Sequence, residues 1–99
     1  MTHIPHLKIL RKSEVAETLG ISLSGVREKT VHGLLPPFIS LGPKKIGYLS
    51  HEIQAVISAL SVGQGDEEIR KLISELVGKR KQYSEAITQS LFRPVGAEL

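Results

Sequence analysis

Apolar residues recur at helical spacing near the start of the chain and predict two short helices joined by a tight turn. The first helix has an inner face made of Val15, Ala16 and Leu19. Ser13 is its predicted N-cap and Gly20 its terminating glycine, and Ser22 is the predicted N-cap of the second helix. Val26 lies on the inner face of the second helix, which ends near Gly33. Helices of about seven and ten residues in this order are typical of a helix-turn-helix unit.

Between residues 34 and 49 the pattern changes to that of a small β-hairpin. The segment "LLPP" interrupts regular helix, and the strand-like segments "FISL" and "KIGYL" are joined by the turn "GPKK". Lys44 and Lys45 stand at the tip of this turn. The end of an N-terminal arm is also strand-like, with the apolar residues Leu7, Ile9 and Leu10. A basic hairpin directly after a helix-turn-helix predicts a winged helix.

Two further amphipathic helices are predicted after the hairpin. The third begins with Ser50 as its N-cap and has an apolar stripe made of Ile53, Val56, Ile57 and Leu60. After a flexible link, "SVGQG", Asp66 caps a fourth helix, whose apolar stripe consists of Ile69, Leu72, Ile73, Leu76 and Val77. Beyond Gln82 the pattern weakens, and "YSEAITQSLF" can extend this helix or belong to a tail.

The predicted fold is mainly α with a small β-hairpin, a winged helix-turn-helix with an appended C-terminal helix. We expect the winged helix-turn-helix domain in residues 1–62, a linker and the C-terminal helix in residues 63–82, and a partly disordered tail in residues 83–99. Because amphipathic helix pairs are common, a small helical bundle is the alternative fold. A winged helix of about 60 residues buries its own apolar surface only marginally, so the fourth helix either completes this core or joins two copies.

Composition narrows the classes of function. The chain has no Cys, which excludes a thiolate metal site or nucleophile. We see no signal peptide and no apolar run of the roughly 20 residues that a membrane helix needs, so we expect a cytoplasmic protein without membrane contact. The net charge is +3, and residues 1–60 carry the whole excess, with seven Lys or Arg against four Asp or Glu. A polyanion would therefore bind to the first part of the chain.

The sequence contains no catalytic constellation. There is no Ser-His-Asp set, and "GQGDEE" lacks the Lys-Ser/Thr ending of a phosphate-binding loop. His3 and His6 have a metal-ligand spacing but stand in the N-terminal arm without further ligands. Glu67 and Glu68 are explained as partners of the helix dipole. We therefore expect no enzyme, no metal and no cofactor.

The exposed side of the second helix supplies the candidate residues for reading DNA, namely Ser22, Leu23, Ser24, Gly25, Arg27 and Glu28. Arg27 is the strongest base reader among them, because Arg can form two hydrogen bonds with a guanine edge. Glu28 can accept from a cytosine amine or pair with a nearby cation, and Leu23 can touch a thymine methyl. The candidate contacts to the DNA backbone are Arg11, Lys12, Lys44 and Lys45.

Gly25 stands inside the predicted second helix, where a Gly costs about 1 kcal/mol relative to Ala. Two explanations remain open. The glycine lets the main chain approach a phosphate or base edge closely. Alternatively, it packs tightly against the first helix or is merely tolerated near a helix end.

Four segments, "ILRKSEVAETLGIS", "SGV", "HGLLPPFISLG" and "KKIGYLSHEIQAVI", together resemble the AlpA-type phage and genomic-island regulators, a MerR-like winged-helix group similar in form to excisionases. The agreement has no gap and spans about residues 9–57. The matching positions are Leu10, Arg11, Glu14, Val15, Gly20, Ile21, Ser22, Ser24, Gly33, Pro36, Leu41, Gly42, Lys44, Gly47, Glu52, Ile53 and Ala55.

This resemblance implies a protein that binds double-stranded DNA at attachment regions and integrase promoters, as a transcriptional regulator or as an excisionase that works with an integrase. It also implies cooperative or dimeric binding to repeated sites. Because the resemblance ends before the fourth helix, it favours that helix as a contact between copies.

The chain departs from the family pattern mainly in the second helix. The family has a basic residue at Leu23, Thr at Gly25, Tyr at Arg27 and a basic residue at Glu28. It also has an aliphatic pair at Lys29 and Thr30, and Trp at Tyr48 and Val56. Tyr48 and Val56 still fill apolar sites, so the same fold is expected. The altered second helix leaves an alternative function, a protein-protein interaction module with a winged-helix fold and little affinity for DNA.

Overall fold

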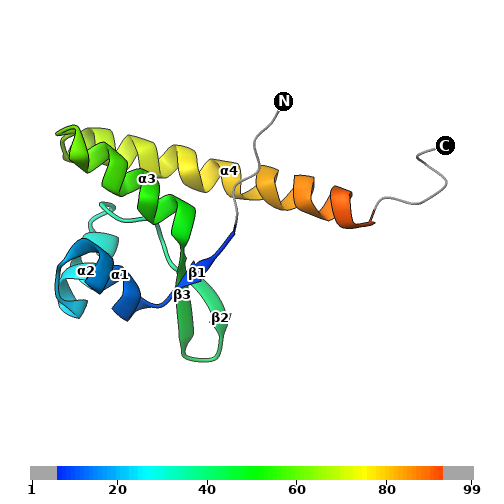
Figure 1. Cartoon of the computed structure of the whole chain (residues 1–99), viewed down its shortest axis with the longest axis horizontal. Coiled ribbons are helices and arrows are strands. Elements are labelled where there is room, and N and C mark those ends of the chain that lie inside the picture. Colours follow the sequence, from blue (N-terminus) through cyan, green and yellow to red (C-terminus); the bar gives the residue numbers. More distant parts are fainter. Residues whose placement is uncertain (1–6, 93–99) are drawn as a thin grey trace.

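The computed structural model describes residues 7–92, which form four helices and a small antiparallel sheet (Figure 1). In chain order the elements are β1 (Ile9–Leu10), α1 (Lys12–Leu19), α2 (Leu23–Val31), β2 (Ile39–Gly42), β3 (Lys45–Leu49), α3 (Ser50–Ser61) and α4 (Asp66–Phe92). This order confirms the predicted fold class, a mainly α winged helix-turn-helix with a small hairpin and an appended helix. Residues 1–6 and 93–99, which include His3 and His6, lie outside the described residues.

The sheet has the strand order β1-β3-β2, so the end of the N-terminal arm forms a third strand beside the hairpin. Ile9 pairs with Leu49, and Leu10 pairs with Tyr48. Gly47 permits this close pairing, because a Cβ at that position would collide with the side chain of Ile9. The strand-like pattern at the end of the arm is therefore confirmed, and it ties the arm to the base of the wing.

The predicted end of α1 is confirmed, and its predicted N-cap is wrong. The N-cap is Arg11 rather than Ser13, because the Arg11 N–H donates to the Glu14 Oε1 at 3.0 Å and Glu14 thereby caps the helix from within its first turn. Gly20 ends α1 in the left-handed conformation with φ of 69°, as predicted. Ser22 is the N-cap of α2, as predicted.

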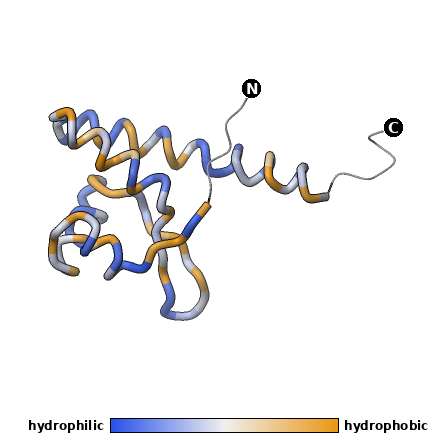
Figure 2. Tube along the Cα trace, viewed as in Figure 1, coloured by the Kyte–Doolittle hydropathy of each residue, from blue (hydrophilic) through white to orange (hydrophobic). Residues whose placement is uncertain are grey.

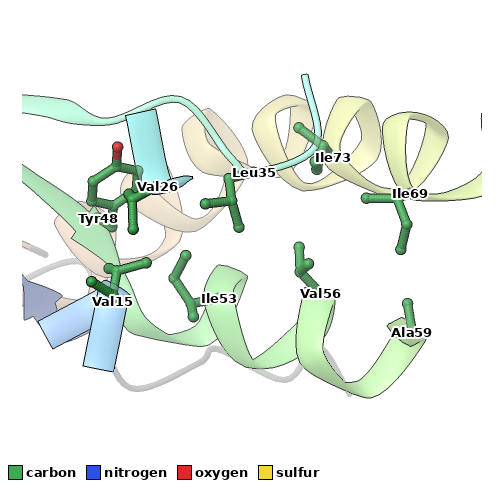
Figure 3. Packing of buried hydrophobic residues seen from close by; sticks show 10 residues of the cluster. Val15, Val26, Leu35, Tyr48, Ile53, Val56, Ala59, Ile69 and Ile73 are labelled. Carbon is green, nitrogen blue, oxygen red and sulfur yellow. The ribbon is translucent and has the colours of Figure 1, made fainter. Parts of the chain in front are cut away.

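A single apolar core joins the winged helix to α4 (Figure 3). Its buried side chains come from α1, α2, β3, α3, α4 and the loop before β2, and they are Val15, Ala16, Val26, Leu35, Tyr48, Ile53, Val56, Ala59, Ile69 and Ile73. Two of these residues, Ile69 and Ile73, lie beyond residue 62, so the core continues past the expected end of the winged-helix domain.

The first half of α4 therefore completes the core, and the preference for a contact between copies at this stripe is corrected. Ile69 and Ile73 are only 2% and 7% exposed, and Leu72 packs against the same cluster. Leu76 is half-buried, and Val77 lies at the exposed edge of the stripe. The buried members thus pack within the chain itself.

The segments on both sides of the expected fourth helix have defined structure. The "SVGQG" segment is a hydrogen-bonded turn, in which Gly63 adopts φ of 80° and its N–H donates to the Leu60 carbonyl at 3.0 Å. The helix α4 then runs to Phe92, so "YSEAITQSLF" extends it, and residues 83–92 are helical rather than part of a tail.

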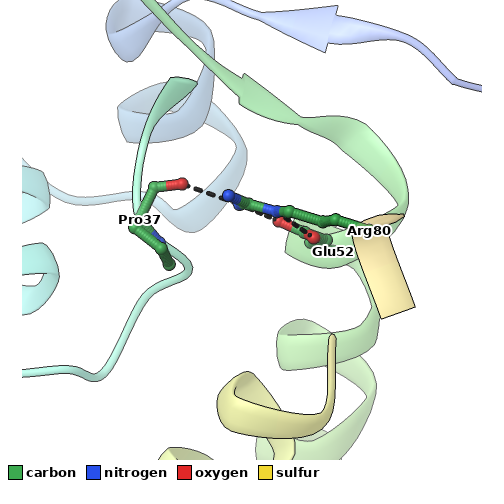
Figure 4. Close-up of polar contacts among 3 residues, drawn as sticks. All are labelled: Pro37, Glu52 and Arg80. Carbon is green, nitrogen blue, oxygen red and sulfur yellow. Dashed lines mark hydrogen bonds and ion pairs between the residues drawn. The ribbon is translucent and has the colours of Figure 1, made fainter. Parts of the chain in front are cut away.

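A buried ion pair fastens the middle of α4 to the rest of the domain (Figure 4). Glu52, in the first turn of α3, has no exposure to solvent. The Arg80 Nε donates to one carboxylate oxygen of Glu52 at 2.8 Å, and the Arg80 Nη2 donates both to the other oxygen and to the Pro37 carbonyl, the latter at 2.8 Å. The hydrogen bond to Glu52 raises the pKa of Arg80, against the opposing effect of burial. One guanidinium group thus links α4, α3 and the loop that leads into the wing.

Replacing Arg80 with Met should lower the free energy of unfolding by about 3–5 kcal/mol, because Glu52 would stay buried without its partner. Adding Glu52→Leu should recover a large part of this loss, because the unpaired carboxylate is then removed. Urea denaturation of the single and double variants measures both effects. Lys79→Met, at an exposed neighbouring position, is the control and should change stability by less than about 0.5 kcal/mol. Equal losses in the Arg80 and Lys79 variants would contradict a structural role for the ion pair.

A fragment of residues 1–62 should fail to fold, because it lacks Ile69, Ile73 and Arg80. A fragment of residues 1–82 retains all three and should unfold in a cooperative thermal transition. Circular dichroism of the two fragments makes the comparison. A cooperative transition in the shorter fragment would mean that the winged helix has a sufficient core of its own.

Candidate nucleic-acid interface

The outward face of α2 presents most of the residues that the sequence assigned to DNA reading. Val26 is completely buried and fixes which side of the helix faces the core. The opposite side is exposed and carries Leu23, Ser24, Arg27, Glu28 and Val31, with Ser22 exposed at the N-cap. Leu23 and Val31 are apolar yet 52% and 73% exposed, so this face combines apolar, polar and charged groups.

Gly25 has close neighbours within its own turn. Its N–H donates to the Ser22 Oγ at 3.0 Å, so this backbone donor is already used by the N-cap. A Cβ at Gly25 would meet the Ser22 Oγ at 3.3 Å and the Ile21 Cβ at 3.4 Å. The missing side chain therefore faces the turn between α1 and α2, and the close neighbours are turn residues rather than residues of the first helix.

Two hydrogen bonds from distant elements hold the C-terminal end of α2. The Thr30 hydroxyl and the Tyr48 hydroxyl on β3 lie 2.9 Å apart, and the Thr30 hydroxyl also donates to the Val26 carbonyl. The Arg70 Nε, on α4, donates to the His32 carbonyl just after α2 at 3.0 Å. Sequence patterns did not single out Arg70, because nothing local to α4 indicates a partner that is 38 positions away. These contacts fix α2 relative to the wing and to α4.

A groove runs between α2 and the hairpin. Its lining residues come from α1, α2, β3 and the approach to β2, and they are Lys12, Arg27, Thr30, Val31, Phe38, Ile46 and Tyr48. Phe38 is 49% exposed, and its ring meets the Tyr48 ring edge-on, with the centroids 6.4 Å apart. The groove therefore has an apolar wall and two cationic side chains, Lys12 and Arg27. Phe38 was not among the predicted site residues, although it follows two prolines in a chain with few aromatic residues.

The remaining predicted basic residues occupy the two expected places. Lys44 and Lys45 are exposed where β2 turns into β3, at the end of the hairpin away from α4 (Figure 1). Lys44 adopts a left-handed conformation with φ of 59°, which an Asn would also tolerate. Arg11 is exposed and Lys12 half-buried at the start of α1. The helix-turn-helix and the wing thus share the side of the molecule opposite α4 (Figure 1).

The chemistry of this surface is that of binding. It offers guanidinium and ammonium groups, hydroxyls and apolar side chains on rigid elements, which suits contacts with phosphates and base edges. Among residues 7–92, no three His, Asp or Glu side chains come together where they could hold a metal ion.

A helix-turn-helix followed by a basic hairpin defines a winged helix-turn-helix protein. The chain belongs to the family of the prophage CP4-57 regulatory protein (AlpA), whose family model matches residues 8–59. This is a family of prophage-type regulatory, DNA-binding proteins, and the assignment confirms the resemblance found in the sequence. The matched region runs from just before β1 to near the end of α3 and leaves α4 outside.

No curated protein and no solved structure matches the chain. None of the helices in the described part of the chain is long and apolar enough to cross a membrane.

Proposed function

We propose that this protein binds double-stranded DNA with sequence preference and acts as a transcriptional regulator, an excisionase for an integrase, or both, in the cytoplasm of a cell that carries a prophage or genomic island. The observation that carries the proposal is the exposed face of α2. It holds Arg27 and is fixed from behind by the buried Val26 and by the hydrogen bonds at Thr30 and His32.

In this proposal α2 enters the major groove. Arg27 is the residue best suited to a guanine edge, Leu23 to a thymine methyl and Glu28 to a cytosine amine. Ser22 and Ser24 lie at the N-terminal end of the helix, where short hydroxyl side chains can bind a phosphate. Gly25 serves the turn that sets the start of the helix.

The basic residues outside α2 are assigned to phosphates. Lys44 and Lys45 contact the backbone from the wing, and Arg11 and Lys12 contact it from the start of α1. Such contacts position the protein and carry little sequence information. A net charge of +3 supports few phosphate contacts per copy, so we expect more than one copy at each site.

One observation favours a second candidate function, a protein-interaction module. The exposed side chains of Val31 and Phe38 make the groove beside α2 apolar, and Glu28 adds a negative charge to the recognition face. An apolar peptide segment with acidic residues would suit this groove, because its cationic side chains are Lys12 and Arg27, and it would compete with DNA.

Gel-shift assays with random duplex and with attachment-region DNA, at two salt concentrations, separate the two functions. The DNA-binding proposal expects shifts of both duplexes at low salt and a preference for the attachment region at higher salt. An absence of any shift at low salt would reject it and leave the interaction module.

Replacing both wing lysines should weaken binding to all DNA sequences to a similar extent. Lys44→Asn with Lys45→Gln removes both charges while keeping the left-handed turn, and should reduce the salt dependence, the slope of log K against log salt, by about one to two units. Titrations at several salt concentrations measure the slope. A changed sequence preference with an unchanged slope would show that the wing reads bases instead.

Arg27→Ala should cost about 1–3 kcal/mol of binding free energy on a preferred site and relax the preference at one base pair. Competition assays on a set of singly substituted duplexes measure this effect. Arg11→Ala is the comparison variant, because a phosphate contact should weaken all duplexes alike. If Arg27→Ala also weakens binding to all duplexes alike, Arg27 contacts the DNA backbone rather than a base.

A further inference from the structure

His51, in the first turn of α3, has hydrogen-bonding capacity that the described part of the chain does not use. Both of its ring nitrogens are buried, and neither has a partner among residues 7–92. The ring meets the Tyr83 ring of α4 edge-on, with the centroids 5.9 Å apart. Burying a polar atom without a partner costs free energy, so such an atom calls for a water molecule, an ion or another part of the chain.

The end of the N-terminal arm lies next to the first turn of α3. The Ser50 N–H donates to the Lys8 carbonyl at 2.8 Å, just beyond the antiparallel pairing of β1 with β3. In Figure 2 the described start of the chain alternates hydrophobic and hydrophilic positions, as expected for a strand. Because the two segments run antiparallel, the chain before Lys8 leads toward the residues that follow Ser50, and the first of these is His51.

Two of the four histidines in the sequence stand directly before this point. His6 is two positions and His3 five positions before Lys8, and five residues span at most about 17 Å. Both side chains can therefore reach His51. In the sequence this pair had a metal-ligand spacing but no further ligand, and His51 supplies the third imidazole from a distant part of the chain.

Three imidazoles suit an ion such as Zn²⁺, which proteins often hold with three side chains and a water molecule. We propose that His3, His6 and His51 bind one divalent transition-metal ion of the zinc class, through one nitrogen of each ring. The ion fastens the N-terminal arm to the first turn of α3, which the Tyr83 ring connects to α4. This proposal replaces the expectation from the sequence that the chain binds no metal, and it does not rest on the proposed DNA-binding function.

The test titrates Zn²⁺ into the full chain by isothermal titration calorimetry, after any bound metal has been removed with a chelator. The wild type should bind one ion per chain, and zinc in large excess over its Kd should raise the Tm by several degrees. The variant His51→Gln and the double variant His3→Gln, His6→Gln should each bind zinc at least about tenfold more weakly, because even the loss of a group that only orients a ligand costs this much.

His32→Gln is the matched control, because it replaces the fourth histidine, which is exposed just after α2. This variant should keep the wild-type zinc affinity. NMR spectra of the histidine side chains test the unchanged chain, so the result does not depend on how the His51→Gln variant folds. Zinc should shift the ring signals of His3, His6 and His51 at the same stoichiometry and leave those of His32 in place.

Four results would overturn the site. Zinc binding that His51→Gln leaves unchanged, with no shift of the His51 signals, would place the ion on the arm alone. A loss of affinity in His32→Gln would place it elsewhere. One ion per two chains would mean that the ligands come from different copies. An absence of both heat and NMR shifts at millimolar zinc would show that the three histidines do not form a metal site.

Discussion

The ion pair between Glu52 and Arg80 is the constraint on which the arrangement of the other elements depends. A carboxylate with no exposure to solvent is costly unless it is paired and fully hydrogen-bonded, and Arg80 meets this need with two donors. The same guanidinium also binds the Pro37 carbonyl, so the partner that neutralises Glu52 also fixes the loop leading to the wing. The start of α3, the middle of α4 and the entry to β2 are thus held together by one guanidinium group.

The placement of α4 also determines the position of α2. The stripe on α4 begins with Ile69 and Ile73, which lie in the core. Arg70, the residue after Ile69, donates a hydrogen bond to the His32 carbonyl at the end of α2. On its other side α2 is held by the hydroxyl pair of Thr30 and Tyr48. The face that carries Arg27 is thus fixed by a helix and a strand that lie outside the helix-turn-helix itself. In the proposed function, this limits the ordering entropy that would be lost when DNA binds.

The sequence predicted those parts of the fold that depend on local spacing and missed those that depend on distant pairing. The helices near the start of the chain were found because Ser22 and Gly20 are strong end signals and Val15, Ala16 and Val26 keep helical spacing. Ser13 was the wrong N-cap. The helix begins earlier, after Arg11, and the Glu14 side chain accepts a hydrogen bond from the Arg11 N–H. No local pattern could show that Glu52 and Arg80, 28 positions apart, form a buried pair.

The candidate site divides in the same way. Exposed positions on α2 and the lysines of the wing follow directly from helix periodicity and turn residues, so the sequence placed them on the surface where the structure has them. The groove depends on how α2 meets the hairpin, and Phe38 lines it directly after Pro37, whose carbonyl accepts a hydrogen bond from Arg80. The groove therefore could not be predicted from local sequence patterns.

The family match stops at residue 59. Residues beyond it nevertheless help to position the candidate DNA-binding surface of the matched segment. Ile69 and Ile73 complete its core, Arg80 neutralises its buried Glu52, and Arg70 holds the end of its recognition helix. A chain with the same first 59 residues and a different fourth helix would need other groups for these tasks, or it would present Arg27 at a different angle. In the proposed function, the geometry of the DNA-binding surface is therefore a property of the winged helix together with α4 as far as Arg80.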